Sequence, residues 1–306
     1  MYGTGHGKKA HTAFTARSGK QLIRLLSAAL FLCVLMGRAA SEYALPIDLS
    51  GGYPLNPAHF GEGWEYEDPT IRVTVTKGRV SGCDYWVADI VIRHASQLRT
   101  APADTFDSDM KTSGVQMAKR VNAVLAINGD YYCYTGIGYI VRQGRTYLNT
   151  LWGNRDVLAI DEDGDFHTFP LAKKGSIRDT IDGKKIINAF FFGPILVQDG
   201  RRVVYIDGEG MAQDEPRQRM AIAQAGPLHY KCICCATHAR GSMGMTLTQF
   251  ANLVAKQDVR TAYNLDGGNS CMMMFAGQKV NDPDNPDTRD ICDIIYFASA
   301  WPGDQP

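Results

Sequence analysis

Apolar and polar residues alternate along most of the chain between residues 71 and 298, a pattern typical of half-buried β-strands. Turn-forming pairs that contain glycine separate several of these runs and favour tight antiparallel connections. They predict hairpins of residues 139–142 with 145–148 around Gln143-Gly144, 157–161 with 166–169 around Asp163-Gly164, 195–198 with 201–206 around Asp199-Gly200, and 220–224 with 228–236 through Gly226-Pro227. Further strands are expected at 71–76, 85–93, 123–127, 261–265, 271–275 and 291–298, the first two separated by turn signals at Lys77-Gly78 and Ser81-Gly82.

Helical patterns are few. Ser113 and Gln116 have the spacing of a capping box, in which the first side chain caps the helix and the second reaches back to the cap. Thr246 and Gln249 repeat this spacing before an apolar helical face, and that helix is expected to end near Asp258. The sequence therefore predicts a single α+β domain over residues 71–300, dominated by mixed or antiparallel sheets with several β-hairpins and a few helices.

The N-terminal segment has the features of a targeting sequence. Basic residues precede thirteen uncharged, mostly apolar residues at 25–37, and no acidic residue occurs before Glu42. This length suits the apolar region of a signal peptide, whereas a membrane-spanning helix needs about 20 residues. Residues 1–40 are therefore predicted to be a signal peptide or an N-terminal membrane anchor that engages the secretion machinery or the membrane, followed by a linker or arm at 41–70. Both alternatives place the remaining chain outside the cytoplasm, either secreted or anchored.

Composition excludes some classes of protein. The 306 residues include 32 basic and 32 acidic side chains, so the formal net charge is zero. A protein that coats nucleic acid needs a basic surplus to neutralise phosphates. Hydrophobic residues make up 45% of the chain, which argues against disorder. We therefore expect a folded protein with a sizeable core and no nucleic-acid partner.

Seven of the eight cysteines follow the N-terminal segment: Cys83, Cys133, Cys232, Cys234, Cys235, Cys271 and Cys292. Disulfides persist outside the cytoplasm, and an odd number leaves at least one thiol unpaired within a monomer. The cluster at 232–235 is an alternative zinc site, although it lacks a second cysteine pair at finger spacing. The sequence leaves the pairing open.

Polar clusters follow or precede apolar strands at three places, and such loops often carry function. The first cluster is Asn128-Gly129-Asp130-Tyr131-Tyr132, in which aromatic rings beside hydrogen-bonding groups suit a sugar. An ordinary Asn-Gly-Asp turn is the alternative interpretation.

The second cluster contains Arg217 and Arg219, which precede a strand with the small residues Ala221 and Ala223. A planar guanidinium can bind two oxygen atoms of a phosphate or carboxylate at once. Solvated arginines at a strand entrance are the alternative.

The third cluster, residues 264–270, delivers Asp266 to a turn with two glycines. The N–H groups of such a turn can point together and form an anion site. Asn264 and Asp266 are expected to share one side of the strand, because side chains alternate. A common Asp-Gly-Gly loop is the alternative.

In this order and spacing, the clusters resemble the motifs of the phosphodiester glycosidase family, which comprises N-acetylglucosamine-1-phosphodiester alpha-N-acetylglucosaminidases and bacterial secreted proteins. Asn128, Gly129 and the tyrosine pair match an Asn-Gly-Gly-aromatic motif, and Arg219 matches an arginine that opens a small-residue strand. Residues 265–270 match a Leu-Asp-Gly-Gly-Gly-Ser motif. The resemblance covers roughly residues 71–298.

The resemblance implies a hydrolase that cleaves a sugar-1-phosphodiester, of N-acetylglucosamine-1-phosphodiester type, on a secreted or cell-surface glycan or glycoconjugate. We expect Arg219 to bind the phosphate and Asp266 to act as general base or acid. Asn128 is expected to orient the substrate, and Asp130 to be a second carboxylate if it faces Asp266. The expected substrate-binding residues are Gly129, Tyr131, Asn264, Gly267, Gly268, Asn269 and Ser270.

Two other functions stay open. Asp130 and Asn269 stand where the family has glycine, and a pocket spoiled by them would leave a non-catalytic secreted module that binds a glycan or cell-wall polymer. A metal-dependent phosphodiesterase is the other alternative. Its Ca²⁺ or other divalent ion would bind the acidic segments 161–165 or 282–287, although neither has EF-hand spacing. No other cofactor is expected.

Overall fold

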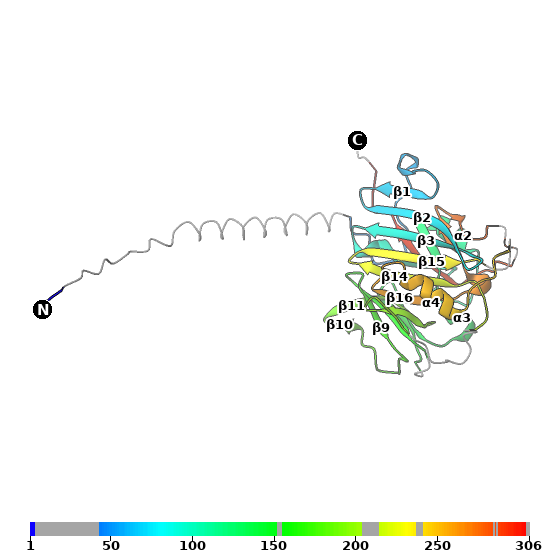
Figure 1. Ribbon diagram of the computed structural model, residues 1–306. Helices are drawn as coiled ribbons and strands as arrows, with labels where there is room; N and C mark the ends of the chain where they lie inside the picture. The colour runs from blue at the N-terminus through cyan, green and yellow to red at the C-terminus, as the bar shows by residue number, and fades with distance from the viewer. Residues whose placement is uncertain are drawn as a thin grey trace. The chain divides into compact units, whose positions relative to one another are not determined.

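The computed structural model describes residues 1–3, 43–151, 155–203, 214–236, 241–283, 285 and 287–303 (Figure 1). The predicted targeting segment lies outside these residues except for its first three, and so does the end of the third predicted hairpin, 204–206. Within the described part of the chain, no helix is both long enough and apolar enough to cross a membrane. The chain divides into two units, residues 1–42 and 43–306, of which the second contains the sheets.

The largest sheet has eight strands in the order β1-β2-β3-β15-β14-β16-β12-β13 (Figure 1). Their bounds are β1 Glu65–Asp68, β2 Ile71–Val80, β3 Cys83–Ile92, β15 His229–Cys235, β14 Met220–Gly226, β16 Thr261–Leu265, β12 Ile195–Gln198 and β13 Arg201–Arg202. All neighbours pair antiparallel. Strand β1 belongs to the segment expected to be a linker or arm, and it forms one edge of this sheet.

The first predicted turn of this sheet is wrong. Gly78 lies inside β2 opposite Tyr85, and the chain reverses at Ser81-Gly82, where both residues have positive φ. A Cβ at Gly78 would lie only 2.3 Å from the Tyr85 ring. This glycine therefore makes room for a cross-strand aromatic side chain and does not mark a turn.

Two smaller sheets complete the fold. One contains β7 Arg145–Asn149, β6 Tyr139–Arg142, β11 Lys184–Phe190, β8 Val157–Asp161 and β9 Phe166–Phe169 in that order, with β10 Thr180–Ile181 paired to β11. The other has the order β18 Gln278–Lys279, β17 Met273–Phe275, β5 Ala123–Asn128, β19 Asp293–Ala298 and β4 Leu98–Pro102. The predicted hairpins β6–β7, β8–β9, β12–β13 and β14–β15 are confirmed over their described residues.

The described helices are short: α2 Gly114–Arg120, α3 Tyr132–Thr135 and α4 Leu247–Ala255, with 3₁₀ turns η1 Pro57–His59, η2 Ala95–Gln97 and η4 Gly268–Ser270. The capping box of α4 is confirmed, since the Thr246 hydroxyl accepts from the Gln249 N–H and the Gln249 side chain accepts from the Thr246 N–H. The capping box expected at Ser113 is wrong. Gln116 instead accepts a hydrogen bond from the Thr112 hydroxyl at 3.0 Å.

The sheets form layers around a shared core. Inner-face residues of the large sheet, such as Ile222, pack against Leu125 of β5 and Leu158 of β8. Helix α4 covers the opposite face of the large sheet (Figure 1), where Phe250 lies in the same apolar cluster as Ala221. The fold is α+β and strand-dominated, as predicted.

Candidate functional site

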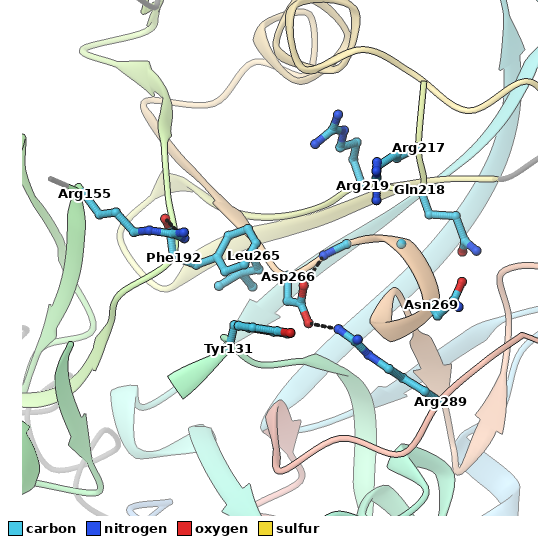
Figure 2. Close-up of a pocket in the computed structure, with 12 residues that line it drawn as sticks. Tyr131, Arg155, Phe192, Arg217, Gln218, Arg219, Leu265, Asp266, Asn269 and Arg289 are labelled. Atoms are coloured by element: carbon cyan, nitrogen blue, oxygen red, sulfur yellow. Dashed lines mark hydrogen bonds and ion pairs between the residues drawn. The ribbon is translucent and has the colours of Figure 1, made fainter. Parts of the chain in front are cut away.

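Antiparallel pairing of β14 with β16 brings two of the predicted clusters together. Met220 pairs with Leu265, so Arg219 just before β14 lies beside Asp266 just after β16. Both residues line one cavity of about 400 Å³ (Figure 2). The sheet register thus brings the Arg219 guanidinium and the Asp266 carboxylate to the same cavity, although 46 residues lie between them in the sequence.

The cavity is rich in positive charge. Its described lining includes Asp266 as the one carboxylate, with four guanidinium groups and two aromatic rings: Arg155, Arg217, Arg219, Arg289, Tyr131 and Phe192. Clefts lined by one sign of charge attract ligands of the opposite sign. The cavity therefore suits an anionic ligand. The two rings can pack against a sugar or another apolar surface that is attached to the anionic group.

Asp266 is held firmly while it faces the cavity (Figure 2). One carboxylate oxygen accepts from the Gly267 N–H at 2.9 Å and the other from Arg289 Nη2 at 2.9 Å. The side chain is almost fully buried, and burial raises the pKa of Asp266 above its ordinary value, while hydrogen bonding from Ser270 and the charge of Arg289 oppose the shift. A fixed carboxyl group with a raised pKa is suited to proton transfer.

Arg289 is a site residue that the sequence analysis missed. Its Nε donates to the Ser270 hydroxyl at 2.7 Å, and its guanidinium lies 5.3 Å from the Tyr131 ring and 4.9 Å from the Tyr134 ring. Burial by itself would lower the pKa of Arg289, but the charge and hydrogen bond of Asp266 together with the nearby Tyr134 and Tyr131 outweigh this effect and raise it. The side chain is therefore a preorganised fork that orients Asp266.

The position of Arg289 shortly before a strand is the signal that could have revealed it. That strand, β19, pairs with β5, with Ile294 opposite Asn128. The loop before β19 consequently ends beside the first predicted cluster. The loop itself has no periodic pattern, so the position before a strand is the one feature of the sequence that points to this arginine.

Arg219 is anchored by main-chain oxygens at the cavity wall. Its Nε donates to the Met245 carbonyl at 3.2 Å and its Nη2 to the Glu215 carbonyl at 2.9 Å. Burial lowers the pKa of Arg219 from that of a solvated guanidinium. The neighbouring Arg217 forms an ion pair with the Glu215 carboxylate. Both arginines of the second cluster thus reach the cavity, and Arg219 is the more buried.

Arg155 and Phe192 form the opposite side of the cavity, with Asp266 between them and Arg219 (Figure 2). The Arg155 guanidinium lies 5.5 Å from the Phe192 ring, and the Tyr131 ring meets that ring edge-on at 6.5 Å. Tyr131 belongs to the first predicted cluster, whereas Arg155 and Phe192 lie outside all three clusters. Arg155 lies shortly before β8 and Phe192 shortly after β11, and both strands belong to a smaller sheet than the one that carries Arg219 and Asp266. Only the tertiary structure brings these residues to the cavity.

The two asparagines expected at the site support it from behind. Asn128 is buried, donates to the Asp266 carbonyl at 2.7 Å and accepts from the Met272 N–H at 3.1 Å. Asn264 is also buried and donates to the Gly193 carbonyl at 2.7 Å. Neither side chain lines the cavity. The expectation that they contact substrate is corrected, because their amides bind and position main-chain groups.

Asp130 does not face Asp266 across the cavity, so the expected carboxylate pair is wrong. Its two oxygens accept from Arg142 Nη2 and from the Phe191 N–H, each at 2.9 Å. Arg142 also contacts Asp293 at 2.8 Å, and all three charged side chains have no exposed surface. We call Asp130, Arg142 and Asp293 the buried charge trio. Asp130 therefore has a structural role, since both of its carboxylate oxygens are hydrogen-bonded within the protein.

The glycines of the first and third clusters serve close packing. A Cβ at Gly129 would lie 2.1 Å from an Asp293 carboxylate oxygen, and one at Gly267 would lie 2.5 Å from the Gln218 carbonyl. Gly267 donates its N–H to the Asp266 side chain and Gly268 donates to the Gln218 carbonyl at 2.9 Å. These N–H groups are occupied within the protein, which argues against the anion site expected from them.

The last two residues of the third cluster differ in location. Asn269 lines the cavity, whereas Ser270 is fully buried and accepts from Arg289. Of the predicted site residues, the structure therefore brings Asp266, Arg219, Tyr131, Gly267, Gly268 and Asn269 to the cavity, with the others behind it.

No metal-binding group of three or more histidine, cysteine, aspartate or glutamate side chains occurs among the described residues. In the acidic turn at 161–165, where the metal-dependent alternative would place a divalent ion, the Lys184 ammonium lies 2.7 Å from Asp163 and 3.7 Å from Asp165. The 282–287 segment includes residues outside the described part. Side chains of Cys234 and Cys235 lie in apolar clusters on opposite faces of the sheet, so they cannot converge on zinc.

Comparison with known proteins identifies the family and supports the fold. Residues 121–298 match the family model of phosphodiester glycosidases. The catalytic domain of zebrafish N-acetylglucosamine-1-phosphodiester alpha-N-acetylglucosaminidase, auto-inhibited by its pro-peptide, has a similar fold, with a TM-score of 0.60 and 18% identity over 81% of this chain and 87% of that chain. A hypothetical protein from Synechocystis is similar with a TM-score of 0.51 and 18% identity over 74% of this chain and 62% of its own.

A search of curated protein sequences found no match. The family match extends over more than half of the chain and includes the three motifs that converge around Asp266. The chain therefore belongs to the phosphodiester glycosidase family.

Proposed function

We propose that this protein hydrolyses a sugar-1-phosphodiester of the N-acetylglucosamine-1-phosphodiester type, in the cavity around Asp266. The observation that carries the proposal is the position of one fixed carboxylate among four guanidinium groups in a single cavity of about 400 Å³. The name of the zebrafish relative describes action on such a phosphodiester, which supports the same substrate class here.

A phosphate leaving group explains why a single carboxylate suffices. Water attacks the anomeric carbon, the bond from that carbon to the bridging oxygen breaks, and the phosphate monoester departs with the oxygen. A phosphate monoester has a second pKa of about 6, so it leaves near neutral pH without first receiving a proton. An ordinary glycoside expels an alcohol and needs a second carboxyl group as acid. The absence of Asp130 from the cavity is therefore compatible with this reaction.

Each cavity residue has a role in this scheme. Asp266 accepts the proton of the attacking water, and Arg289 and the Gly267 N–H hold its carboxylate in place. Arg219 stabilises the charge that accumulates on the departing phosphate. Tyr131 and Phe192 provide the apolar surface against which a sugar ring packs.

We further propose that the protein acts outside the cytoplasm. Cys133 and Cys292 form a disulfide, and such bonds persist mainly in oxidising compartments. The basic and apolar N-terminal sequence has the composition of a signal peptide or anchor. Both features support export, either as a secreted or as a membrane-anchored protein.

The test is hydrolysis of UDP-N-acetylglucosamine and synthetic N-acetylglucosamine phosphate esters in oxygen-labelled water. We expect wild-type protein to release sugar that carries the label on its anomeric hydroxyl, and Arg219→Ala to lose most of this activity. Label in the phosphate product, together with sensitivity to a chelator, would indicate a metal-dependent phosphodiesterase instead. Glycan binding without release by folded protein would support the binding-module alternative.

A further inference from the structure

Five cysteines of the described chain are outside the Cys133–Cys292 disulfide, and all five are buried: Cys83, Cys232, Cys234, Cys235 and Cys271. Free thiols in an exported protein meet disulfide donors while the chain folds. The arrangement of these five side chains therefore determines which additional bonds can form.

Strand geometry separates the two adjacent cysteines of β15. Side chains alternate along a strand, so Cys234 and Cys235 point to opposite faces of the large sheet. Cys234 belongs to the core between the sheets, together with Cys271. Cys235 belongs to the cluster under α4, together with Cys83. Each of the two therefore meets a different cysteine.

Strand register places both pairs close together. Cys83 lies at the start of β3, two residues from Tyr85, which pairs with Cys235, so the cysteines are diagonal neighbours on one face. Cys234 pairs with Met220, the residue after Arg219, and the Cys271 sulfur lies 3.3 Å from the Arg219 carbonyl oxygen. The neighbours also interact electrostatically, since Cys235 lowers the pKa of Cys83, and burial followed by the proximity of Cys234 raises the pKa of Cys271.

Cys232 differs from the other four. It lies on the same face of β15 as Cys234, two residues away, and burial raises its pKa with no contribution from another thiol. The seven cysteines after the N-terminal segment thus divide into three neighbouring pairs and one isolated residue, which accounts for their odd number.

We propose that Cys83–Cys235 and Cys234–Cys271 are oxidised to disulfides in the exported protein, and that Cys232 stays a thiol. In each bond, two thiols lose two protons and pass two electrons to the disulfide of a donor such as oxidised glutathione or a disulfide-bonded oxidase. The donor is released with its disulfide reduced to two thiols. One thiolate attacks the donor disulfide, and the second cysteine then displaces the donor from the mixed disulfide.

Burial sets the order of events. Cys83, Cys234, Cys235 and Cys271 are at most 1% exposed, so a donor can reach them only before the large sheet closes. Burial also raises the pKa of Cys235 and Cys271 well above the ordinary thiol value, which suppresses their reactive thiolates in the folded protein, whereas the interaction with Cys235 lowers the pKa of Cys83. Oxidation is therefore expected during folding and to be slow afterwards.

Both proposed bonds lie beside the main chain of Arg219. The Cys235 N–H donates to the Arg219 carbonyl at 3.1 Å, and the Cys271 sulfur lies 3.3 Å from the same oxygen. Bonds on opposite faces of the sheet would fix the start of β14 from both sides. They would hold the cavity arginine in position without contacting the ligand.

Peptide mapping of the full chain exported into an oxidising compartment tests the pairing. Denatured protein is treated with N-ethylmaleimide to block free thiols and is then digested with trypsin without reduction. We expect one species that joins peptides 80–93, 232–240 and 261–279, with a single maleimide on Cys232. Fragmentation of the middle peptide assigns the blocked position. Maleimide on all five cysteines, or a disulfide at Cys232, would overturn the proposal.

Two variants sharpen the assignment. Cys232→Ser is expected to give the same three-peptide species, because this thiol has no partner. Cys235→Ser is expected to release peptide 80–93 with maleimide on Cys83 and to keep the bond between Cys234 and Cys271. If Cys235→Ser fails to fold, backbone fragmentation of the wild-type three-peptide species between Cys234 and Cys235 still decides the pairing, because the fragment with Cys234 should carry peptide 261–279 and the fragment with Cys235 should carry peptide 80–93.

Discussion

Two groups of arginine and aspartate side chains lie close together in this protein, and they differ in charge balance and in access. In the buried charge trio, one guanidinium serves the two carboxylates Asp130 and Asp293, and none of the three side chains is exposed. The lining of the cavity has four guanidinium groups and one carboxylate, Asp266, with Glu215 as a further partner of Arg217, and the Arg289 side chain is 37% exposed.

This difference teaches how the same residue types become structural in one place and functional in another. The trio satisfies its charges internally and has no capacity left for a ligand. The cavity has an excess of positive charge that an anionic ligand can neutralise. The motif Asn128-Gly129-Asp130 lies between the two groups, and it contributes its carboxylate to the trio and its asparagine to the Asp266 loop.

The largest expected effect on stability comes from breaking the trio. Arg142→Gln leaves two buried carboxylates without their counter-charge, and such a change typically destabilises a protein by about 3–5 kcal/mol. Arg289→Gln is the matched comparison, because it also removes the partner of a nearly buried carboxylate, Asp266, but that carboxylate faces the cavity and Arg289 is 37% exposed, so a smaller loss is expected. Urea unfolding of both variants measures the difference. Equal losses of stability would show that the two groups are not distinct.

A smaller effect, on activity alone, is expected from Arg289→Lys. Lysine keeps the charge but cannot donate to Asp266 and Ser270 at once with a planar fork. Misplacement of the carboxylate is expected to lower kcat on the order of 10- to 100-fold, with the unfolding midpoint nearly unchanged. Arg145→Lys is the control, since that side chain is 69% exposed and pairs with Asp107 away from the cavity. Wild-type kcat in Arg289→Lys would refute the positioning role.

A third effect is a dependence of stability on pH that arises in the trio. Burial raises the pKa of Asp293 to about 7, against a lowering by Arg142 and a further rise from Asp130. Between the ordinary value of 3.8 and about 7, the folded protein holds a proton that the unfolded chain has released. Stability from this group therefore falls as pH rises through that window, by at most about 1.4 kcal/mol per pH unit.

Comparison with Asp293→Asn isolates this contribution. Urea unfolding at several pH values between 4 and 8 gives the difference in free energy of unfolding between the variant and the wild type. We expect that difference to shift in favour of the variant as pH rises, because asparagine does not titrate. A difference that stays constant with pH would remove Asp293 as the source.

Much of the fold could be predicted because it is local. Hairpins such as β8–β9 depend on short-range alternation and on turn residues with the required backbone freedom, both visible in the sequence. Gly78 misled the prediction because its role is tertiary. It accommodates the Tyr85 ring across the strand pair, and only knowledge of the register would show this.

The site could be predicted in part for the same reason. Asp266 and Arg219 belong to motifs with recognisable neighbours, whereas Arg155 and Arg289 come from loops that only sheet pairing brings to the cavity. Asp130 was assigned to the wrong group, because its partner Arg142 lies on β6 of another sheet. Sequence spacing does not reveal which of two nearby aspartates has a buried counter-charge.

The most direct test of this account compares Asp266→Asn with Asp130→Asn for release of sugar from an N-acetylglucosamine phosphate ester, with rates normalised to folded protein. Removal of a general base typically costs about 10²- to 10⁴-fold in rate. We predict a loss of this size for Asp266→Asn, whereas folded Asp130→Asn keeps a rate close to wild type but unfolds at lower urea concentration. Full activity in Asp266→Asn, or an equal loss of rate in folded Asp130→Asn, would contradict the account.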